Sequence, residues 1–246
     1  MRLRIALSRH NLDNNQEMTI PLDYRRYFIS IIKTITDGSP MFKRFGEEKP
    51  GYSPYAFAVH FARIKSIETS NKQMVIRPPV IMTISTGMFE VMTAICNGAI
   101  KMMGKETVLG MSINNIRLLP DKRIKSRTVT FKIASHSVLR GREDYLNGNT
   151  KSELEESINT HLLTKLGFLN TQYNREILPS EQYPLHLVSA SGIKKGVCLH
   201  YGGNLTTLRG NITLAGETPA LQFLYDYGMG VRTGQGFGLL EVISEA

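Results

Sequence analysis

Cysteine is scarce in this sequence and long apolar runs are missing, and each absence excludes a class of protein. The chain of 246 residues has two cysteines, Cys96 and Cys198, neither of them in a CxxC pair or at ligand spacing from a histidine. We therefore expect neither a structural zinc site nor a disulfide. No apolar run approaches the roughly 18 residues that a membrane helix needs, and the start of the chain, "MRLRIALSRH", lacks the apolar stretch of a signal peptide. We expect a cytoplasmic protein with no membrane partner.

Acidic residues are also few relative to basic ones. The chain has 30 Lys and Arg against 21 Asp and Glu, which gives a net charge of +9 and a pI of about 9.6. Basic side chains that neutralise phosphates release counterions and so drive association with polyanions. A generally basic proteome is the alternative explanation, but the excess favours nucleic acid as the partner.

The spacing of apolar residues predicts the same order of elements twice. In the first half we expect a strand, a helix, two strands, a helix and a strand, at residues 1–8, 21–36, 52–64, 72–86, 86–104 and 107–120. Two prolines in the fourth of these segments suit an edge strand or a bulge. In the second half we expect a strand at 127–135, a helix at 151–168, a hairpin of 183–190 with 196–203, a strand at 204–216, a helix at 218–228 and a strand at 237–244.

This β-α-β-β-α-β order is that of the ferredoxin-like arrangement. We predict an α+β fold of tandem ferredoxin-like domains, residues 1–122 and 123–246, joined near 120–125. The second domain carries a C-terminal glycine-rich loop, "GMGVRTGQGFGLLE" at 228–241. Glycine-rich turns that bind phosphate usually follow a strand and open a helix, whereas this loop precedes the last strand. Its glycines would let backbone N–H groups approach an anion, with Arg232 adding a charged contact; the alternative is a loop shaped only for tight turns and packing.

The terminal pattern G-x-G-x-R-T-G-x-G-x-G, after a short helix and before an apolar strand, resembles the glycine-rich loop of the CRISPR-associated repeat-RNA processing proteins, the Cas six family of the RAMP superfamily. The segments "TVTFKIASHSVLRGR" and "YGGNLTTLRGNITLAGETPALQFLYDYGMG" agree with it. The resemblance implies binding of the repeat of a CRISPR precursor transcript and cleavage by a ribose 2′-hydroxyl, without metal or cofactor, leaving a 2′,3′-cyclic phosphate and a 5′-hydroxyl. It also admits effector-complex subunits as partners and a homodimer.

Such cleavage needs a base, an acid and a cation near the phosphate. The resemblance places a catalytic histidine after the first helix, but "DGSPMFKRFGEEKPGYSPYAF" contains none. One interpretation puts Glu47 or Glu48 in its place, with Tyr27, Lys33 or Lys49 as acid or phosphate stabiliser. A carboxylate beside a polyanion has a raised pKa, although a solvated charge cluster explains the same residues.

Two further interpretations remain open. In one, His60 supplies the chemistry from the small-residue face of its strand, with His136 a weaker candidate; a passive surface histidine is the alternative. In the other, the protein binds repeat RNA or guide RNA without cutting it, as a binding module or a RAMP-type structural subunit. Loss of one acid–base group removes on the order of 10² to 10⁴ in rate while phosphate contacts survive.

Basic and aromatic residues outside the chemistry are candidates for RNA contact, because cations bind phosphates and aromatic rings stack on unpaired bases. Packing or surface roles suffice for His161, His186 and His200. The candidates for RNA contact are Arg25, Arg26, Lys43, Arg44, Tyr52, Tyr55, Lys122, Arg123, Lys125, Arg127, Arg140, Arg142, Lys194, Lys195, Gly228, Gly230, Arg232, Gly234, Gly236 and Gly238.

Overall fold

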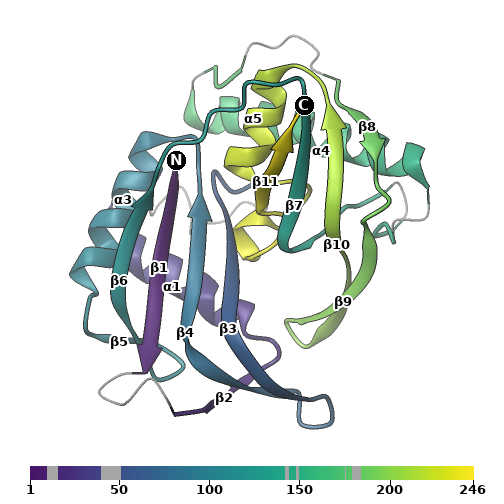
Figure 1. Ribbon diagram of the computed structural model, residues 1–246. Coiled ribbons are helices and arrows are strands. Elements are labelled where there is room, and N and C mark those ends of the chain that lie inside the picture. Colours follow the sequence, from purple (N-terminus) through teal and green to yellow (C-terminus); the bar gives the residue numbers. More distant parts are fainter. Residues whose placement is uncertain (10–15, 40–50, 142–143, 148–149, 175, 179–183) are drawn as a thin grey trace.

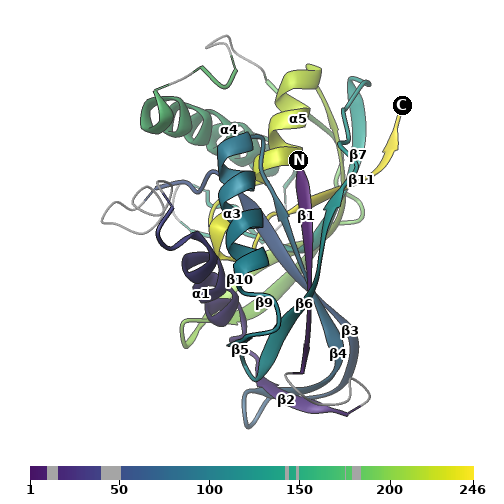
Figure 2. The same cartoon turned by 90° about the vertical axis from the view of Figure 1, so that its left-hand side faces the viewer.

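The chain folds into two antiparallel sheets that lie side by side, with helices on one side of them (Figure 1). This computed structural model describes residues 1–9, 16–39, 51–141, 144–147, 150–174, 176–178 and 184–246. Figure 2 shows that the helices cover one side of the strands. The opposite side of both sheets, which faces the viewer in Figure 1, is called the open face below.

The first sheet has the order β2-β4-β1-β6-β5, with β3 on the other side of β4. Its strands are β1 (Arg2–Arg9), β2 (Met18–Pro21), β3 (Ala56–Glu68), β4 (Gln73–Ser85), β5 (Glu106–Val108) and β6 (Met111–Leu119), and its helices are α1 (Arg25–Thr36) and α3 (Phe89–Lys101). In β1, Leu3, Ile5 and Leu7 alternate with more exposed residues and lie in the core. They share one core cluster with the apolar residues of α1, which recur at helical spacing.

The second sheet has the order β11-β7-β10-β8, with β9 also paired to β10. Its strands are β7 (Thr128–Ser137), β8 (His186–Ser189), β9 (Lys194–His200), β10 (Gly203–Ala215) and β11 (Leu240–Glu245), and its helices are α4 (Lys151–Tyr173) and α5 (Thr218–Tyr227). Pro219 stands in the first turn of α5, where its missing N–H costs no hydrogen bond. Each half of the chain therefore forms one antiparallel sheet with helices packed on it.

Of the two alternatives for the segment with Pro78 and Pro79, an edge strand or a bulge, the structure has the bulge. The segment is not an edge strand, because β4 pairs with β3 on one side and with β1 and β2 on the other. The prolines fall between the residues that pair with β2, which end at Ile76, and those that pair with β1, which begin at Val80. The β3–β4 register shifts at the same place, between Phe61 and Arg63, so a bulge accommodates them.

The expected hairpin of 183–190 with 196–203 does not form. Both β8 and β9 pair with β10 instead, one after the other along the same long strand. Lys194 and Lys195, expected in a hairpin turn, are therefore the first residues of β9, opposite Arg209 and Leu208. The helix at 151–168 also runs on past Gly167 to Tyr173.

The two sheets meet along a line of small side chains, called the seam below. Ala56 and Ala58 of β3 pack against Ala134 of β7 and Leu239. Methyl side chains let two backbones approach closely. The small-residue face of β3, expected to be open, is thus partly covered by the second sheet.

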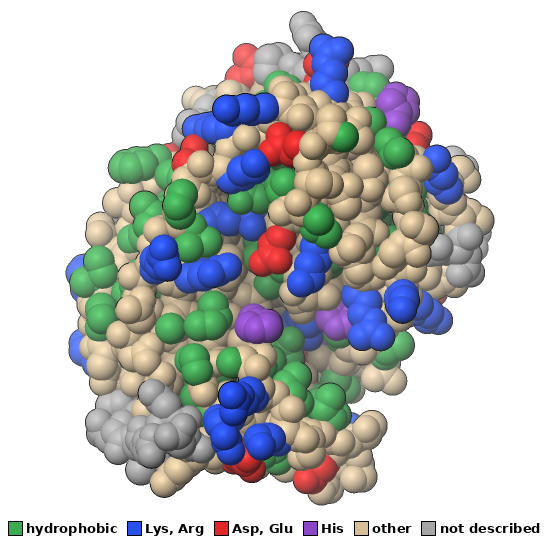
Figure 3. Space-filling model, in the orientation of Figure 1, with side chains coloured by type: hydrophobic (Ala, Val, Ile, Leu, Met, Phe, Trp, Pro, Cys, Tyr) green, Lys and Arg blue, Asp and Glu red, His purple; other side chains and the backbone are tan. Residues whose placement is uncertain are grey.

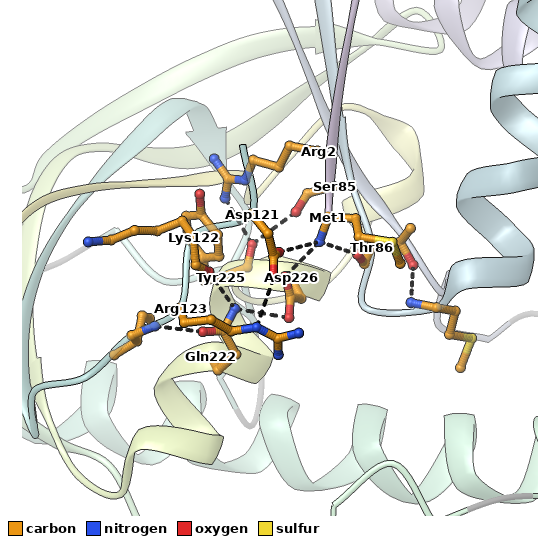
Figure 4. Close-up of polar contacts among 12 residues, drawn as sticks. Met1, Arg2, Ser85, Thr86, Asp121, Lys122, Arg123, Gln222, Tyr225 and Asp226 are labelled. Carbon is orange, nitrogen blue, oxygen red and sulfur yellow. Dashed lines mark hydrogen bonds and ion pairs between the residues drawn. The ribbon is translucent and has the colours of Figure 1, made fainter. Parts of the chain in front are cut away.

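Polar contacts close the same junction at its upper end (Figure 4). The Arg2 guanidinium is buried, lies 3.6 Å from the centre of the Tyr225 ring, and donates hydrogen bonds to the backbone oxygens of Tyr225 and Leu240. The Ser85 hydroxyl donates to the same Tyr225 oxygen. These bonds join β1 and β4 to α5 and β11. In the part of the chain that the structure describes, no helix is long and apolar enough to span a membrane.

Candidate nucleic-acid interface

The glycine-rich loop lies inside the junction between the sheets and not on the surface. Gly228, Gly230, Gly234, Gly236 and Gly238 are all buried. Two of its backbone N–H groups donate to the chain around the end of β7: that of residue 231 to Val138 O at 2.9 Å, and that of residue 238 to His136 O at 2.7 Å. The loop is thus hydrogen-bonded to the end of β7, and these two N–H groups are not available to bind a phosphate.

Positive φ angles explain why glycine occupies these positions. Gly230 has φ +82° and Gly238 has φ +72°, and a Cβ atom at either would lie 2.2 Å from a backbone oxygen. Side chains cannot be accommodated there without moving β7 or the loop. The structure therefore supports turn formation and packing for these glycines, whereas Arg232 of the same loop is half-exposed.

Arg232 and two neighbours form a polar chain at the edge of the loop. Its guanidinium donates to Gln235 Oε1 at 3.0 Å and to the Tyr145 hydroxyl at 3.2 Å. The same Gln235 oxygen lies 2.9 Å from His200 Nε2. Because an oxygen can only accept, His200 Nε2 carries the proton.

His200 faces Asp23 on its other side. His200 Nδ1 lies 3.9 Å from Asp23 Oδ1, and both atoms are buried without a hydrogen-bond partner among the described residues. Burial lowers the pKa of His200 below its ordinary value, and the nearby Arg232 acts in the same direction. A neutral, buried imidazole is suited to fixing the loop against the β9–β10 turn.

Lys165 holds the loop from the helix side. This residue of α4 is almost fully buried, and its ammonium donates to the backbone oxygen of Tyr227 and to Thr233 Oγ1, the latter at 2.9 Å. Thr233 in turn donates to Tyr55 O at 3.1 Å. Burial lowers the pKa of Lys165 to about 7.

Arg25 and Tyr55, two candidates for RNA contact, are parts of this interior. Arg25 is 3% exposed and donates to Gly236 O at 3.3 Å and to Ser135 Oγ at 3.0 Å, and Tyr55 is 6% exposed. Neither side chain can meet RNA in this conformation. The sequence shows the charge of Arg25 and the aromatic ring of Tyr55, but it did not reveal that the second sheet covers both side chains.

The open face carries the exposed cations near the seam. Lys132 of β7 lies between the buried Phe131 and Ile133, and Arg4 of β1 lies between the buried Leu3 and Ile5, so both point away from the helices. Figure 3 shows Lys, Arg and His side chains gathered on this face across the middle of the molecule.

Neighbouring strands add to this group. Arg117 lies opposite Arg4 on β6, and Arg209 lies opposite Lys194 on β10 and β9. We call the exposed cations of the open face the basic face, and its members are Arg4, Arg117, Lys132, Lys194 and Arg209. Of these five residues, only Lys194 was among the candidates predicted from the sequence. For Arg4 and Lys132 a signal was available, because a charged residue between two buried apolar residues of a strand points to the opposite face.

Two histidines accompany the basic face. His60 follows Ala56 and Ala58 on the same side of β3 and, unlike them, is exposed just beyond the seam. His136 of β7 is half-buried, with Nδ1 2.9 Å from Thr207 Oγ1. Burial, together with the charges of Arg25 and Arg209, lowers the pKa of His136 to about 4, so it is neutral at pH 7.

The candidates on α1 lie on the other side of the first sheet from His60. Lys33 is exposed, and Tyr27 is half-exposed and accepts a hydrogen bond from Arg26 at 2.9 Å. Because α1 packs on the helix side of the sheet, these groups and His60 do not converge on one point. Several candidates lie outside the described residues, namely Lys43, Arg44, Glu47, Glu48, Lys49 and Arg142.

The remaining candidates for RNA contact are scattered. In the segment that joins the sheets, Lys122 pairs with Glu245, Arg123 with Asp121 and Arg127 with Glu217, so much of that charge is neutralised. Lys125, whose backbone N–H also binds Glu245, is exposed.

Tyr52 and Arg140 meet at α4. The Tyr52 hydroxyl lies 3.2 Å from His161 Nδ1, and the other nitrogen of that ring lies 3.1 Å from both backbone atoms, N and O, of Arg140. His161 thus connects the two segments. Among the described residues, no group of three or more His, Cys, Asp and Glu is placed to hold a metal ion.

Comparison with solved structures identifies the class of fold. The chain aligns over 100% of its length with 99% of the product of a Cas6-related gene from Pyrococcus furiosus, at 18% identity and a TM-score of 0.75. It aligns over 99% with all of a RAMP protein that binds different RNA substrates, at 16% identity and a TM-score of 0.73. A Cas6 product complex matches over 98% of this chain and 99% of that one, at 14% identity and a TM-score of 0.64.

A family comparison adds the family itself. Residues 119–242, half of the chain, match the family described as CRISPR associated protein Cas6, C-terminal. The chain belongs to the Cas6 family. No curated protein matches it by sequence. Membership implies a role in binding or processing CRISPR RNA.

Proposed function

We propose that this protein binds the repeat of a CRISPR precursor RNA on the basic face and cleaves it without a metal. The attacking ribose 2′-hydroxyl loses its proton to a base, its oxygen bonds to the adjacent phosphorus, and the 5′-oxygen leaves with a proton from an acid. The products are a 2′,3′-cyclic phosphate and a 5′-hydroxyl. The observation that carries the proposal is the row of exposed cations that crosses the seam, in a member of the Cas6 family.

Strand order supports the division into two ferredoxin-like domains, residues 1–122 and 123–246, within this proposal. The long strands of the first sheet lie in the order β6-β1-β4-β3, and those of the second in the order β11-β7-β10 followed by β8 and β9. Each half then presents a sheet whose helices cover one face and whose other face is free for RNA, as in other sheet-based RNA-binding modules.

His60 is the acid–base group that the described residues favour. It is exposed on the same face as the cations, whereas His200 is buried and His136, at a pKa of about 4, is a poor proton donor at pH 7. Arg4 and Lys132 would stabilise charge on the phosphate. Glu47 and Glu48 are the alternative base.

A second candidate function is binding of repeat or guide RNA without cleavage. One observation favours it: the described acid–base candidates on α1 and on β3 lie on opposite sides of the first sheet. The cations of the basic face would still bind RNA in a protein that lacks a catalytic acid and base.

One assay separates the two functions. Repeat RNA from the organism's own CRISPR array is incubated with the protein in EDTA, beside the same RNA with a single 2′-deoxy substitution at the cut site. Cleavage of the first RNA alone supports the enzyme, and tight binding with no cleavage supports the binding module. Absence of both binding and cleavage contradicts the proposal.

Variants then assign the base. His60→Ala should lower the single-turnover rate about 100-fold or more, whereas His186→Ala, at an exposed histidine of β8, should leave it unchanged. Full activity in His60→Ala together with loss in Glu47→Gln or Glu48→Gln would move the base to a carboxylate.

A further inference from the structure

Arg232 combines an unusual backbone conformation with a charged side chain. Its φ is +59°, in the left-handed region that residues with a side chain adopt rarely and at a cost in free energy. Its neighbours Gly230 and Gly236 also have positive φ, and there the residue is glycine. A residue that keeps its side chain in such a conformation is a candidate for a role of that side chain in function.

The guanidinium of Arg232 is fixed and still has donors left for a ligand. Within the described residues it gives one N–H to Gln235 Oε1 and one to the Tyr145 hydroxyl. A guanidinium has five N–H groups, and with two of them used, three remain on a half-exposed side chain. These donors can bind the oxygens of a phosphate. Because the side chain is already held, binding would cost it little conformational freedom.

Gln235 can hold Arg232 only with its side-chain amide in one orientation. Its Oε1 atom lies 3.0 Å from Arg232 Nη1 and 2.9 Å from His200 Nε2, so the same oxygen accepts both hydrogen bonds. Rotating the amide by half a turn would set its NH₂ group against the guanidinium, which has no acceptor.

The hydrogen bond from His200 opposes that rotation. A rotated amide could bond to His200 only if the ring moved its proton to Nδ1. That proton would gain no hydrogen bond, because Nδ1 lies 3.9 Å from Asp23 Oδ1. The present orientation of Gln235, in which it accepts from both neighbours, is therefore the favoured one.

His200 is itself immobile. Its side chain is 3% exposed, and its ring meets the Phe237 ring edge-on, with 5.2 Å between the ring centres. The residue ends β9, at the lower end of the second sheet in Figure 1, and the following turn is fixed by a hydrogen bond of 3.3 Å from the Gly202 N–H to Asp23 Oδ2. An imidazole held in this way can fix the position of Gln235.

We propose that His200 is a positioning residue, which acts through Gln235 to hold Arg232 in the orientation that binds a phosphate of the repeat RNA. This role rests on the proposed function, because it takes RNA as the ligand. His200 itself does not touch the RNA, since it is buried beneath the loop.

Two substitutions of His200 separate its hydrogen bond from its packing. His200→Phe keeps a ring but removes the donor, whereas His200→Gln can place an amide N–H where Nε2 was. Affinity is measured by fluorescence anisotropy on repeat RNA with a 2′-deoxy substitution at the cut site. Arg232→Ala should weaken binding about tenfold, and His200→Phe about threefold to tenfold. His200→Gln should bind like wild type, as should the control His186→Phe at an exposed histidine of β8.

A double-mutant cycle tests whether His200 acts through Arg232. In the Arg232→Ala background, His200→Phe should cause no further loss of affinity, whereas in the Lys132→Glu background it should cause its full loss. A general structural role of His200 would lower affinity equally in both backgrounds. That result overturns the proposal, and so does wild-type affinity in Arg232→Ala or a failure of His200→Gln to restore binding.

A measurement without RNA separates this role from the proposed function. ¹⁵N relaxation of the Arg232 side-chain Nε–H group should show a rigid group in wild type and in His200→Gln, and a mobile one in His200→Phe. A wild-type protein that does not bind repeat RNA contradicts the proposed function, while the relaxation data still decide whether His200 positions Arg232. An Arg232 signal that is alike in wild type and His200→Phe overturns the positioning role.

Discussion

Lys165 Nζ lies 2.9 Å from Thr233 Oγ1, and this contact fastens α4 to the middle of the glycine-rich loop. Thr233 passes the connection on to the backbone of Tyr55 in the first sheet. A buried amine thus holds three segments at the junction of the sheets. Burial lowers the pKa of Lys165 to about 7. The charge of the amine, and with it the contribution of this contact to stability, therefore depends on pH.

The first prediction concerns that dependence. The unfolded chain holds the Lys165 proton up to a pKa near 10.5, whereas the folded chain releases it near 7. Between these values the unfolded state binds more protons, so the free energy of unfolding rises with pH, by up to about 1.4 kcal/mol per unit. Lys165→Met removes this slope. Urea unfolding at pH 7 and pH 9 should show a larger loss of stability in the variant at pH 9, and an equal loss at both would contradict the lowered pKa.

A second prediction tests the packing role of the loop glycines. Gly230→Ala places a Cβ atom 2.2 Å from Val138 O at a residue with φ +82°. The left-handed conformation alone costs a side chain about 1–2 kcal/mol, and the clash adds to it. We expect a clear fall in the thermal midpoint. Gly167→Ala is the control, because nothing lies within 4 Å of its Cβ in α4, and it should stabilise the helix by about 0.5–1 kcal/mol.

The third prediction follows the imidazole at the edge of the loop. Burial lowers the pKa of His200, and Gln235 Oε1 accepts a hydrogen bond from its Nε2–H group. Gln235→Glu exchanges a neutral acceptor for a carboxylate, which stabilises the imidazolium and should raise that pKa. An NMR titration of the histidine ring signals measures it. An unchanged pKa of His200 in the variant would show that the side chains of residues 200 and 235 do not contact each other in solution.

The fourth prediction tests the basic face. Lys132→Glu and Arg4→Glu should each weaken binding of repeat RNA and reduce the dependence of affinity on salt, because each removes a phosphate contact. Lys105→Glu, at an exposed lysine before β5, changes the net charge by the same amount away from this face. Fluorescence anisotropy at several salt concentrations compares them. Equal effects of all three would mean that overall charge, and no particular surface, governs affinity.

The sequence predicted most of the fold because its elements carry local signals. Alternation in β1 and helical spacing in α1 depend on residues a few positions apart, and the structure has both elements. Pairing of β8 and β9 with the same long strand depends on residues distant in the sequence. Local patterns therefore indicated two strands but not their partner.

The site was harder to predict because burial at the junction is a property of the assembled sheets. Arg25 looks like a surface cation in the sequence, yet Gly236, Ser135 and the ring of Phe237 enclose it. Conversely, Lys132 was not among the predicted candidates, although it lies between two core residues of β7, Phe131 and Ile133. RNA contact by the individual candidates stays a prediction.

The alanines of the seam have a mechanical consequence. The side chains between β3 and β7 are those of Ala56, Ala58, Ala134 and Leu239, and Arg2, Lys165 and Arg25 form hydrogen bonds across the same junction. If repeat RNA binds across both halves as proposed, this packing would fix the spacing between the phosphate contacts on one sheet and those on the other.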